Sequence, residues 1–83
     1  MTAWIITRRH TAPYKYPATA AGYLTAGDNW REFRIDELLT FDILPHIFTN
    51  YEQAFFWIMR NGIRTYDYKV TEINLLLEVK HNA

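Results

Sequence analysis

The 83-residue chain has no cysteine and no serine, and these two absences remove much of the usual catalytic chemistry. Without cysteine there can be no disulfide, no thiolate nucleophile and no cysteine-ligated zinc site. Of the aliphatic hydroxyl nucleophiles threonine remains, and no threonine lies in a recognisable catalytic motif. A cysteine-free composition is also compatible with a reducing cytoplasm.

Glycine and histidine are scarce as well. The three glycines form no phosphate-binding Gly-rich motif. The three histidines are isolated from one another, with no metal-chelating spacing, at His10, His46 and His81. His46 follows a proline in an apolar stretch, so we expect it to be a hydrogen-bonded structural residue. We therefore expect a protein that is not an enzyme and has no metal or cofactor site.

The sequence has neither an excess of one charge nor a long hydrophobic run. Nine basic and nine acidic side chains give zero net charge, unlike a protein that binds nucleic acid mainly through phosphates. No apolar run approaches the roughly 18 residues of a membrane span. The first arginines follow the N-terminal apolar run, whereas those of a signal peptide precede it. We expect one soluble, cytoplasmic domain over residues 1–83.

Aromatic residues, in contrast, are abundant. The chain has three tryptophans, six tyrosines and five phenylalanines. A small domain has a small core, so some of these rings are expected at the surface. Exposed aromatic side chains are typical anchors of protein interfaces.

Three strands are predicted in the first half of the chain. The stretch 2–9 is rich in β-branched and aromatic residues, which favours a strand. The stretches 22–25 and 30–35 predict a hairpin. Its turn, residues 26–29, contains residues that tolerate a positive φ angle.

A proline-bounded arm, "TAPYKYPATA", lies between the first strand and the hairpin. Pro13 and Pro17 disfavour both a helix and a central strand there. The arm is either a recognition loop that presents Tyr14 and Tyr16 or a plain packed loop.

The clearest predicted element is a helix over about residues 50–61, "TNYEQAFFWIMRNG" with its flanks. Thr49 and Glu52 have the spacing of a capping box, and Asn61-Gly62 suggests a left-handed stop. A buried stripe is predicted from the i, i+3, i+4, i+7 spacing of Tyr51, Ala54, Phe55 and Ile58. Phe56 lies on the opposite, polar side.

The stretch "DELLTFDILP" before this helix allows two interpretations. Asp36 could cap a short helix over about residues 36–44, with Glu37 in its first turn, where the helix dipole favours acidic side chains. Alternatively, the segment is irregular apolar chain that covers the core. We favour the short helix, and Asp36, Glu37 and Asp42 then have no catalytic role.

The last predicted strand, residues 65–80, changes the phase of its apolar alternation. Tyr66, Tyr68 and Val70 point one way in a regular strand. Ile73, Leu75, Leu77 and Val79 point the other way. Either a bulge near Thr71–Glu72 restores the phase, or both faces carry apolar side chains. Without a bulge, Tyr66 and Tyr68 are candidates for the open face of the sheet.

Together these elements predict an α+β domain. A small, mostly antiparallel sheet of three to four strands packs on one main helix, with a short second helix over about residues 36–44.

The layout of "FTNYEQAFFWIMRN" followed by the strand "YDYKVTEINLLLEV" resembles small phage-encoded host-takeover proteins, such as anti-CRISPR proteins and phage inhibitors of host RNA polymerase. The resemblance concerns layout and carries no diagnostic motif. It implies a non-catalytic inhibitor from a phage or mobile element that blocks a surface of a host defence or nucleic-acid-processing complex. The neutral charge departs from acidic nucleic-acid mimics and favours an aromatic and arginine surface.

The expected partner is a host protein or ribonucleoprotein complex, contacted by aromatic anchors and arginines. The predicted contact residues are Tyr14, Tyr16, Trp30, Arg31, Arg34, Phe56, Arg60, Tyr66 and Tyr68. Two alternatives stay open. A nucleic-acid-binding module would use Arg8, Arg9 and Lys15 with the nearby rings, and a homodimer would form through the exposed edge of the last strand.

Overall fold

The computed structural model describes residues 2–11, 20–34 and 40–74. Its elements, in chain order, are β1 (Thr2–His10), β2 (Ala20–Leu24), β3 (Trp30–Arg34), α1 (Tyr51–Asn61) and β4 (Tyr66–Asn74). The strands form one four-stranded sheet in the order β3-β2-β1-β4, and every neighbouring pair is antiparallel. The expected small α+β fold is confirmed.

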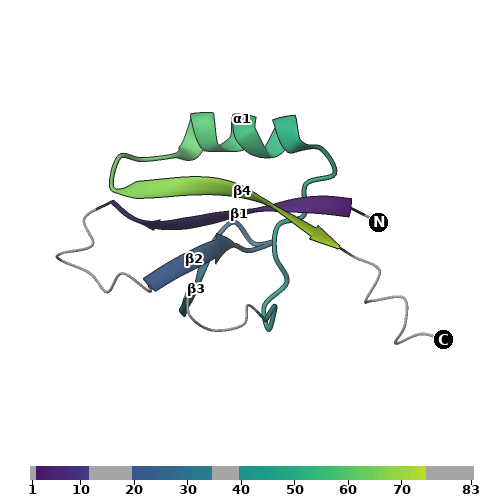
Figure 1. Ribbon diagram of the computed structural model, residues 1–83, viewed down its shortest axis with the longest axis horizontal. Coiled ribbons are helices and arrows are strands. Elements are labelled where there is room, and N and C mark those ends of the chain that lie inside the picture. The colour runs from purple at the N-terminus through teal and green to yellow at the C-terminus, as the bar shows by residue number, and fades with distance from the viewer. Residues whose placement is uncertain (1, 12–19, 35–39, 75–83) are drawn as a thin grey trace.

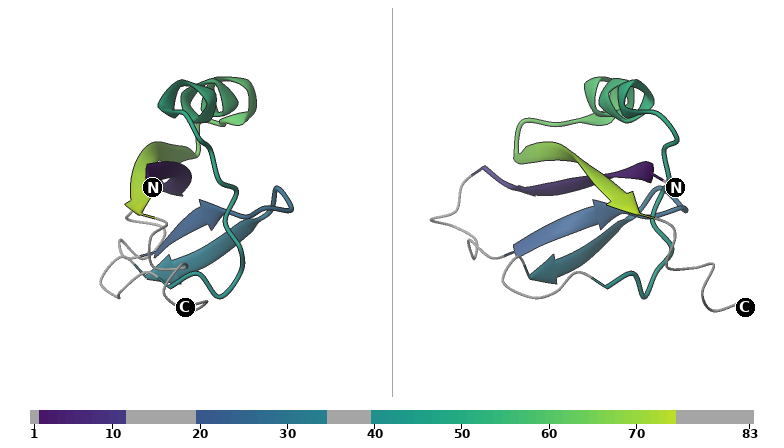
Figure 2. Two further views of the ribbon diagram at one scale, coloured as in Figure 1. Left: turned by 90° about the vertical axis from the view of Figure 1, so that its right-hand side faces the viewer. Right: turned by 45° about the vertical axis from the view of Figure 1, so that its right-hand side comes forward.

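The helix covers one face of the sheet, over β1 and β4. α1 packs against β1 and β4, whereas the β2–β3 hairpin turns away beneath them (Figure 1). The same order, with β1 and β4 between the helix and the hairpin, is visible in both views of Figure 2. β3 and β4 are therefore the two edge strands of the sheet.

The core has two parts because β1 is apolar on both faces. Ile5 and Ile6 are both fully buried, and consecutive strand residues point to opposite faces of the sheet. Ile6 packs in a cluster with Leu24, Phe48 and Ala54, between the sheet and α1. Ile5 therefore contributes to the face that lies away from α1.

The segment before α1 is irregular, and the prediction of a short helix is wrong over residues 40–44, which contain no helix. Residues 36–39 of that prediction lie outside the described residues. The backbone hydrogen bonds of this segment go to the strands. The His46 N–H donates to Leu24 O at 2.9 Å, and Phe48 exchanges two bonds with Trp4 at 2.8 and 2.9 Å. Irregular chain that covers the core is the correct interpretation here.

The turn of the hairpin forms as predicted. The Asp28 N–H donates to Thr25 O at 2.9 Å, and Asp28 has a φ of 60°, the positive value that Asp tolerates. The Asp28 carboxylate lies 2.9 Å from Nδ1 of His46, whose ring stacks on Phe48. His46 is thus the hydrogen-bonded structural residue that was expected.

Both ends of α1 differ in detail from the prediction. The N-cap is Asn50, one residue after Thr49; its side chain accepts the N–H of Glu52 at 2.8 Å and of Gln53 at 3.3 Å. Gly62 has a φ of −66°, so the stop is not left-handed. A Cβ at this glycine would lie 2.6 Å from Ile58 O, and close approach is the reason why glycine stands there.

The predicted buried stripe of α1 is only half correct. Ala54 is fully buried and Ile58 is half-buried, but Tyr51 and Phe55 are 52% and 46% exposed. Trp57 takes a half-buried position instead. The helix is turned so that its smallest side chain meets the sheet and Trp57 reaches Trp30, with 6.0 Å between the ring centroids.

β4 has no bulge in its described part. Its pairing with β1 runs without a break from Thr2 opposite Asn74 to His10 opposite Tyr66. The strand therefore carries apolar side chains on both faces, the second of the two alternatives. Tyr68 and Val70 pack against the cluster beneath α1, so the placement of Tyr68 on an open face is wrong. Tyr66 is half-buried and its ring lies against Arg8.

Candidate functional site

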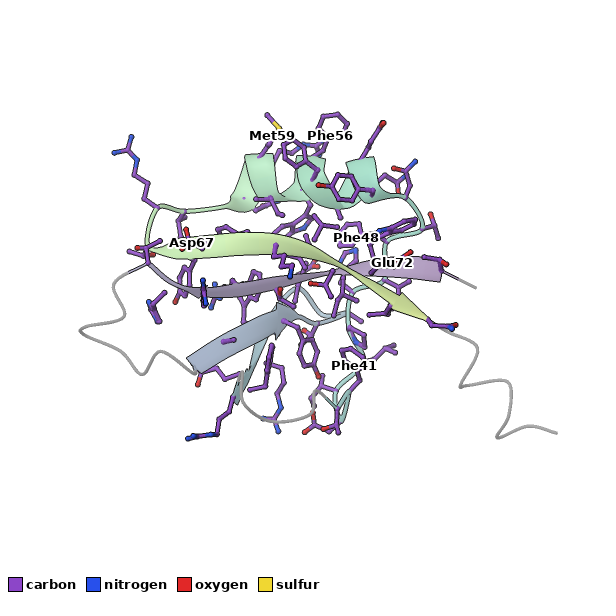
Figure 3. The ribbon with its side chains drawn as sticks, viewed as in Figure 1. Phe41, Phe48, Phe56, Met59, Asp67 and Glu72 are labelled. Carbon is purple, nitrogen blue, oxygen red and sulfur yellow. The ribbon has the colours of Figure 1, made fainter. Side chains whose placement is uncertain are left out.

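The outer surface of α1 gathers large exposed apolar side chains. Their exposed fractions are 52% for Tyr51, 46% for Phe55, 52% for Phe56, 68% for Met59 and, just after the helix, 57% for Ile63. Phe56 and Met59 project away from the sheet (Figure 3). Isolated exposed apolar residues are ordinary, but a continuous group on one element marks a contact surface.

This surface has two sides, because α1 sits on the sheet through Ala54. Trp57 leans toward the hairpin, where its ring meets Trp30. Ile58 lies close to Gly62 and to Tyr68 of β4. Successive helical residues turn by about 100°, which defines a hairpin side, formed by Phe56, Trp57 and Arg60, and an edge side, formed by Tyr51, Phe55 and Met59.

The hairpin side contains a hollow of about 250 Å³. It is lined by Phe48, Gln53, Phe56, Trp57, Arg60 and Asn61. Ligand pockets for small molecules are usually larger, at roughly 300–1,000 Å³. The hollow is therefore about the size of one large side chain, and the exposed Arg60 in its lining can donate charge-assisted hydrogen bonds.

Trp30 and Tyr66 hold a cation between them. The guanidinium carbon of Arg8 lies 3.9 Å from the ring centroid of Trp30 and 3.8 Å from that of Tyr66. Arg8 is half-buried and links the two edge strands through its stacking. Arg9, the next residue, is exposed and points to the other face of the sheet.

Arg31 is engaged within the molecule. Its Nη2 lies 2.5 Å from Oδ2 of Asp42, and its Nε donates to Oδ1 at 3.3 Å. The hydrogen bond from Arg31 lowers the pKa of the Asp42 carboxyl, and the same bond raises the pKa of Arg31. The buried Tyr23 hydroxyl donates to Ile43 O at 2.7 Å, and burial raises its pKa. These contacts fasten residues 42 and 43 to the hairpin.

The structure brings the predicted contact residues together in two places: Phe56 and Arg60 line the hollow, whereas the rings of Trp30, Tyr66 and Tyr68 lie next to one another. Trp30, Tyr66 and Tyr68 are half-buried. Arg31 and Arg34 are exposed on β3, away from α1. Tyr14 and Tyr16, as well as Lys15 of the nucleic-acid alternative, lie outside the described residues.

Sequence reasoning missed the edge side of α1. The signal was present, since residues 54–59 read "AFFWIM" and one face of a helix cannot bury six consecutive apolar residues. The spacing did not show which of them face the sheet. The contact of Trp57 with Trp30 settles this.

Within residues 2–11, 20–34 and 40–74, no group of three or more His, Asp or Glu side chains could hold a metal ion. No helix in that same part of the chain is long and apolar enough to cross a membrane. Comparison with protein-family models, curated proteins and solved structures finds no match.

Proposed function

We propose that this protein is a non-enzymatic protein-binding module whose partner contacts the hairpin side of α1. One observation carries the proposal. Phe56 is 52% exposed on a helix whose neighbouring residues shape an apolar hollow, with the cation of Arg60 at its rim.

The energetics support a partner. Each Å² of apolar surface removed from water is worth about 25 cal/mol, and the exposed Phe56 and half-buried Trp57 offer such surface beside the hollow. Aromatic and arginine residues are the side chains that most often dominate binding energy. A partner segment with an apolar side chain next to Asp or Glu would fill the hollow with the first and form an ion pair with Arg60 through the second.

The specific form of this proposal is an inhibitor from a phage or mobile element, similar to anti-CRISPR proteins. It would block a functional surface of a host defence or nucleic-acid-processing complex in the host cytoplasm. This form is supported by the resemblance in layout and by the neutral charge, which favours a protein surface over phosphates as the target.

The experiment compares tagged wild-type protein with two variants in cells of the source organism, followed by quantitative mass spectrometry. Phe56→Ala removes the proposed anchor. Phe41→Ala is the matched control, because Phe41 is 40% exposed at the other end of the molecule (Figure 3). The partner is the protein that wild type and Phe41→Ala retain and Phe56→Ala loses.

With the purified partner, Phe56→Ala should weaken binding about 30-fold, which corresponds to about 2 kcal/mol. Equal affinity for all three proteins would refute the proposed contact surface. The nucleic-acid alternative is tested by mobility shift with single- and double-stranded oligonucleotides at two salt concentrations. Tight binding that falls steeply with salt would favour that alternative and contradict ours.

A further inference from the structure

The outer edge of β4 offers hydrogen-bonding groups. Within the described residues β4 pairs with β1 alone. Trp4 of β1 directs its N–H and C=O to Phe48, on the side away from β4. Because these groups alternate in direction along a strand, the neighbours Ala3 and Ile5 direct theirs to β4, and so do Thr7 and Arg9.

The alternation continues across the pairing. The residues of β4 opposite those four, and therefore bonded to β1, are Ile73, Thr71, Lys69 and Asp67. The residues between them direct N–H and C=O outward, and these are Tyr68, Val70 and Glu72. No described residue pairs with this outward row. Such an edge is a template for another strand.

We propose that this edge pairs with β4 of a second copy of the chain. The two strands run antiparallel about a two-fold axis, with Tyr68 opposite Tyr68 of the second copy. The two sheets then form one continuous sheet, and each surface patch contacts its own equivalent, as in most homodimers.

The charges of Asp67 and Lys69 favour this pairing register over the neighbouring ones. Asp67 and Lys69 are both exposed on the face away from α1. With Tyr68 on the axis, Asp67 lies opposite Lys69 of the second copy, and symmetry makes the same pair twice. Opposite charges in directly facing positions stabilise a strand pair, and like charges destabilise it.

The neighbouring registers lack this complementarity. Centring the pairing on Lys69 places the two Lys69 side chains opposite each other. Centring it on Val70 places Lys69 opposite Thr71 and Asp67 opposite Ile73, so no opposite charges meet. The register with Tyr68 on the axis is the one of these three in which both charges find partners.

The same arrangement covers the edge side of α1. Strands lie about 4.8 Å apart, and α1 packs over β1 and β4. The two helices of the dimer would therefore be about two strand spacings apart, roughly 10 Å, which is the distance of packed helices. Tyr51, Phe55 and Met59 of each copy would face those of the other copy and lose their exposure to water.

This inference goes beyond the proposed function and does not depend on it. The hairpin side of α1, with Phe56 and Arg60, points away from the two-fold axis and stays accessible. A dimer would present two such surfaces to its partner. Mass and cross-links of the purified chain report on the dimer alone, so a negative result there would leave the partner site untouched.

Cross-linking tests the register directly, because the chain has no cysteine of its own. Asp67→Cys and Lys69→Cys are made as separate variants; both side chains are exposed. In the proposed register a non-hydrogen-bonded pair joins positions 67 and 69 at a Cα separation of about 4.5 Å, within the range of a disulfide. Under mild oxidation the mixed variants should form a covalent dimer, and each variant alone should form little. Equal yields alone and mixed, or none, would overturn the register.

Charge reversal tests the pairing in solution, with mass measured by sedimentation over a range of concentrations. Lys69→Glu should weaken the dimer about tenfold, because it sets Glu opposite Asp twice. The exchange of both charges, Asp67→Lys with Lys69→Asp, should restore wild-type dimerisation. A monomeric wild-type chain at the highest soluble concentration, or an exchange that fails to restore the dimer, would overturn the proposal.

Two adjacent phenylalanines test the helix contact. Phe55 and Phe56 are 46% and 52% exposed, on different sides of α1. Phe55→Asp should weaken the dimer at least tenfold, since it buries a charge between the helices, and Phe56→Asp should leave dimerisation unchanged. The reverse ranking would contradict the proposed arrangement.

Discussion

At the scale of single residues, Arg8 shows how a charge is accommodated inside a small aromatic domain. Its guanidinium is stacked between Trp30 and Tyr66, and Gly22 of β2 lies opposite it with no side chain. The sequence placed Arg8 among nucleic-acid contacts because it stands beside Arg9. Alternation along β1 separates the two arginines onto different faces.

Arg8→Met keeps most of the side-chain length but removes the charge and the planar group. It should lower the free energy of unfolding by about 1 kcal/mol through the lost cation–π contacts. Arg9→Met is the matched control and should change it by less than about 0.5 kcal/mol, since Arg9 is exposed. Urea denaturation measures both. Equal effects would contradict the structural role of Arg8.

The N-cap of α1 allows a second test at this scale. Asn50→Ala removes the acceptor for two backbone N–H groups and should cost about 1 kcal/mol of stability. Thr49→Ala, which would be the damaging change if the capping box were formed, should have little effect. Thermal or urea unfolding of the two variants shows whether Asn50 or Thr49 caps the helix.

Gly62, at the end of α1, allows a third test of a single residue. Gly62→Ala should destabilise the fold by about 1–3 kcal/mol, because the new Cβ would lie 2.6 Å from the backbone oxygen of Ile58. Gly27→Ala is the control, as its Cβ would meet nothing closer than 3.8 Å and no glycine has a positive φ. A tolerated Gly62→Ala would show that the end of α1 can move.

At the scale of elements, the existence of α1 and of the strands was predictable, but the orientation of the helix was not. Strong caps and periodicity mark a helix within its own sequence. Which side faces the sheet depends on residues far away in the chain. Here the rings of Trp30 and Tyr68 fill the space beneath α1, so the small side chain of Ala54 lies where the helix comes closest to the sheet. Tyr51 and Phe55 therefore turn outward.

The irregular segment over residues 40–48 was the less favoured of two interpretations for a related reason. Its hydrogen bonds run to Trp4, Leu24 and Ala26, and no local pattern reveals such partners. The contact of Arg31 with Asp42 holds its beginning on the hairpin. The local helix-cap signal therefore predicted a helix, whereas hydrogen bonds to distant residues hold the segment as irregular chain.

The Arg31–Asp42 contact makes stability depend on pH. Because Arg31 lowers the pKa of Asp42, the contact contributes stability above the ordinary carboxyl pKa of about 3.9 and loses it as the pH falls through the lowered value. Arg31→Gln should be less stable than wild type at neutral pH, and the difference should shrink as the pH falls below the ordinary carboxyl pKa of about 3.9. Urea unfolding over a series of pH values measures this. A difference that grows in acid would contradict the assignment.

At the scale of the whole molecule, the sequence sufficed for the fold class because alternation, turn residues and one capped helix all agree with a single layout. It did not suffice for the exposed apolar surface of α1 on which the proposed contact rests. Phe56 and Arg60 were predicted, since they stand on the polar side of α1. Tyr51, Phe55 and Met59 were not, since exposure on the edge side follows from how the helix sits on β1 and β4.

The central claim concerns the hairpin side of α1, and site-specific photo-crosslinking in cells of the source organism tests it most directly. A photoreactive phenylalanine analogue replaces Phe56 in one variant and Phe41 in another, both exposed rings. We expect a discrete cross-linked protein from position 56, absent from position 41 and lost when Arg60 is also changed to Glu. No cross-link from position 56, or the same product from both positions, would contradict it.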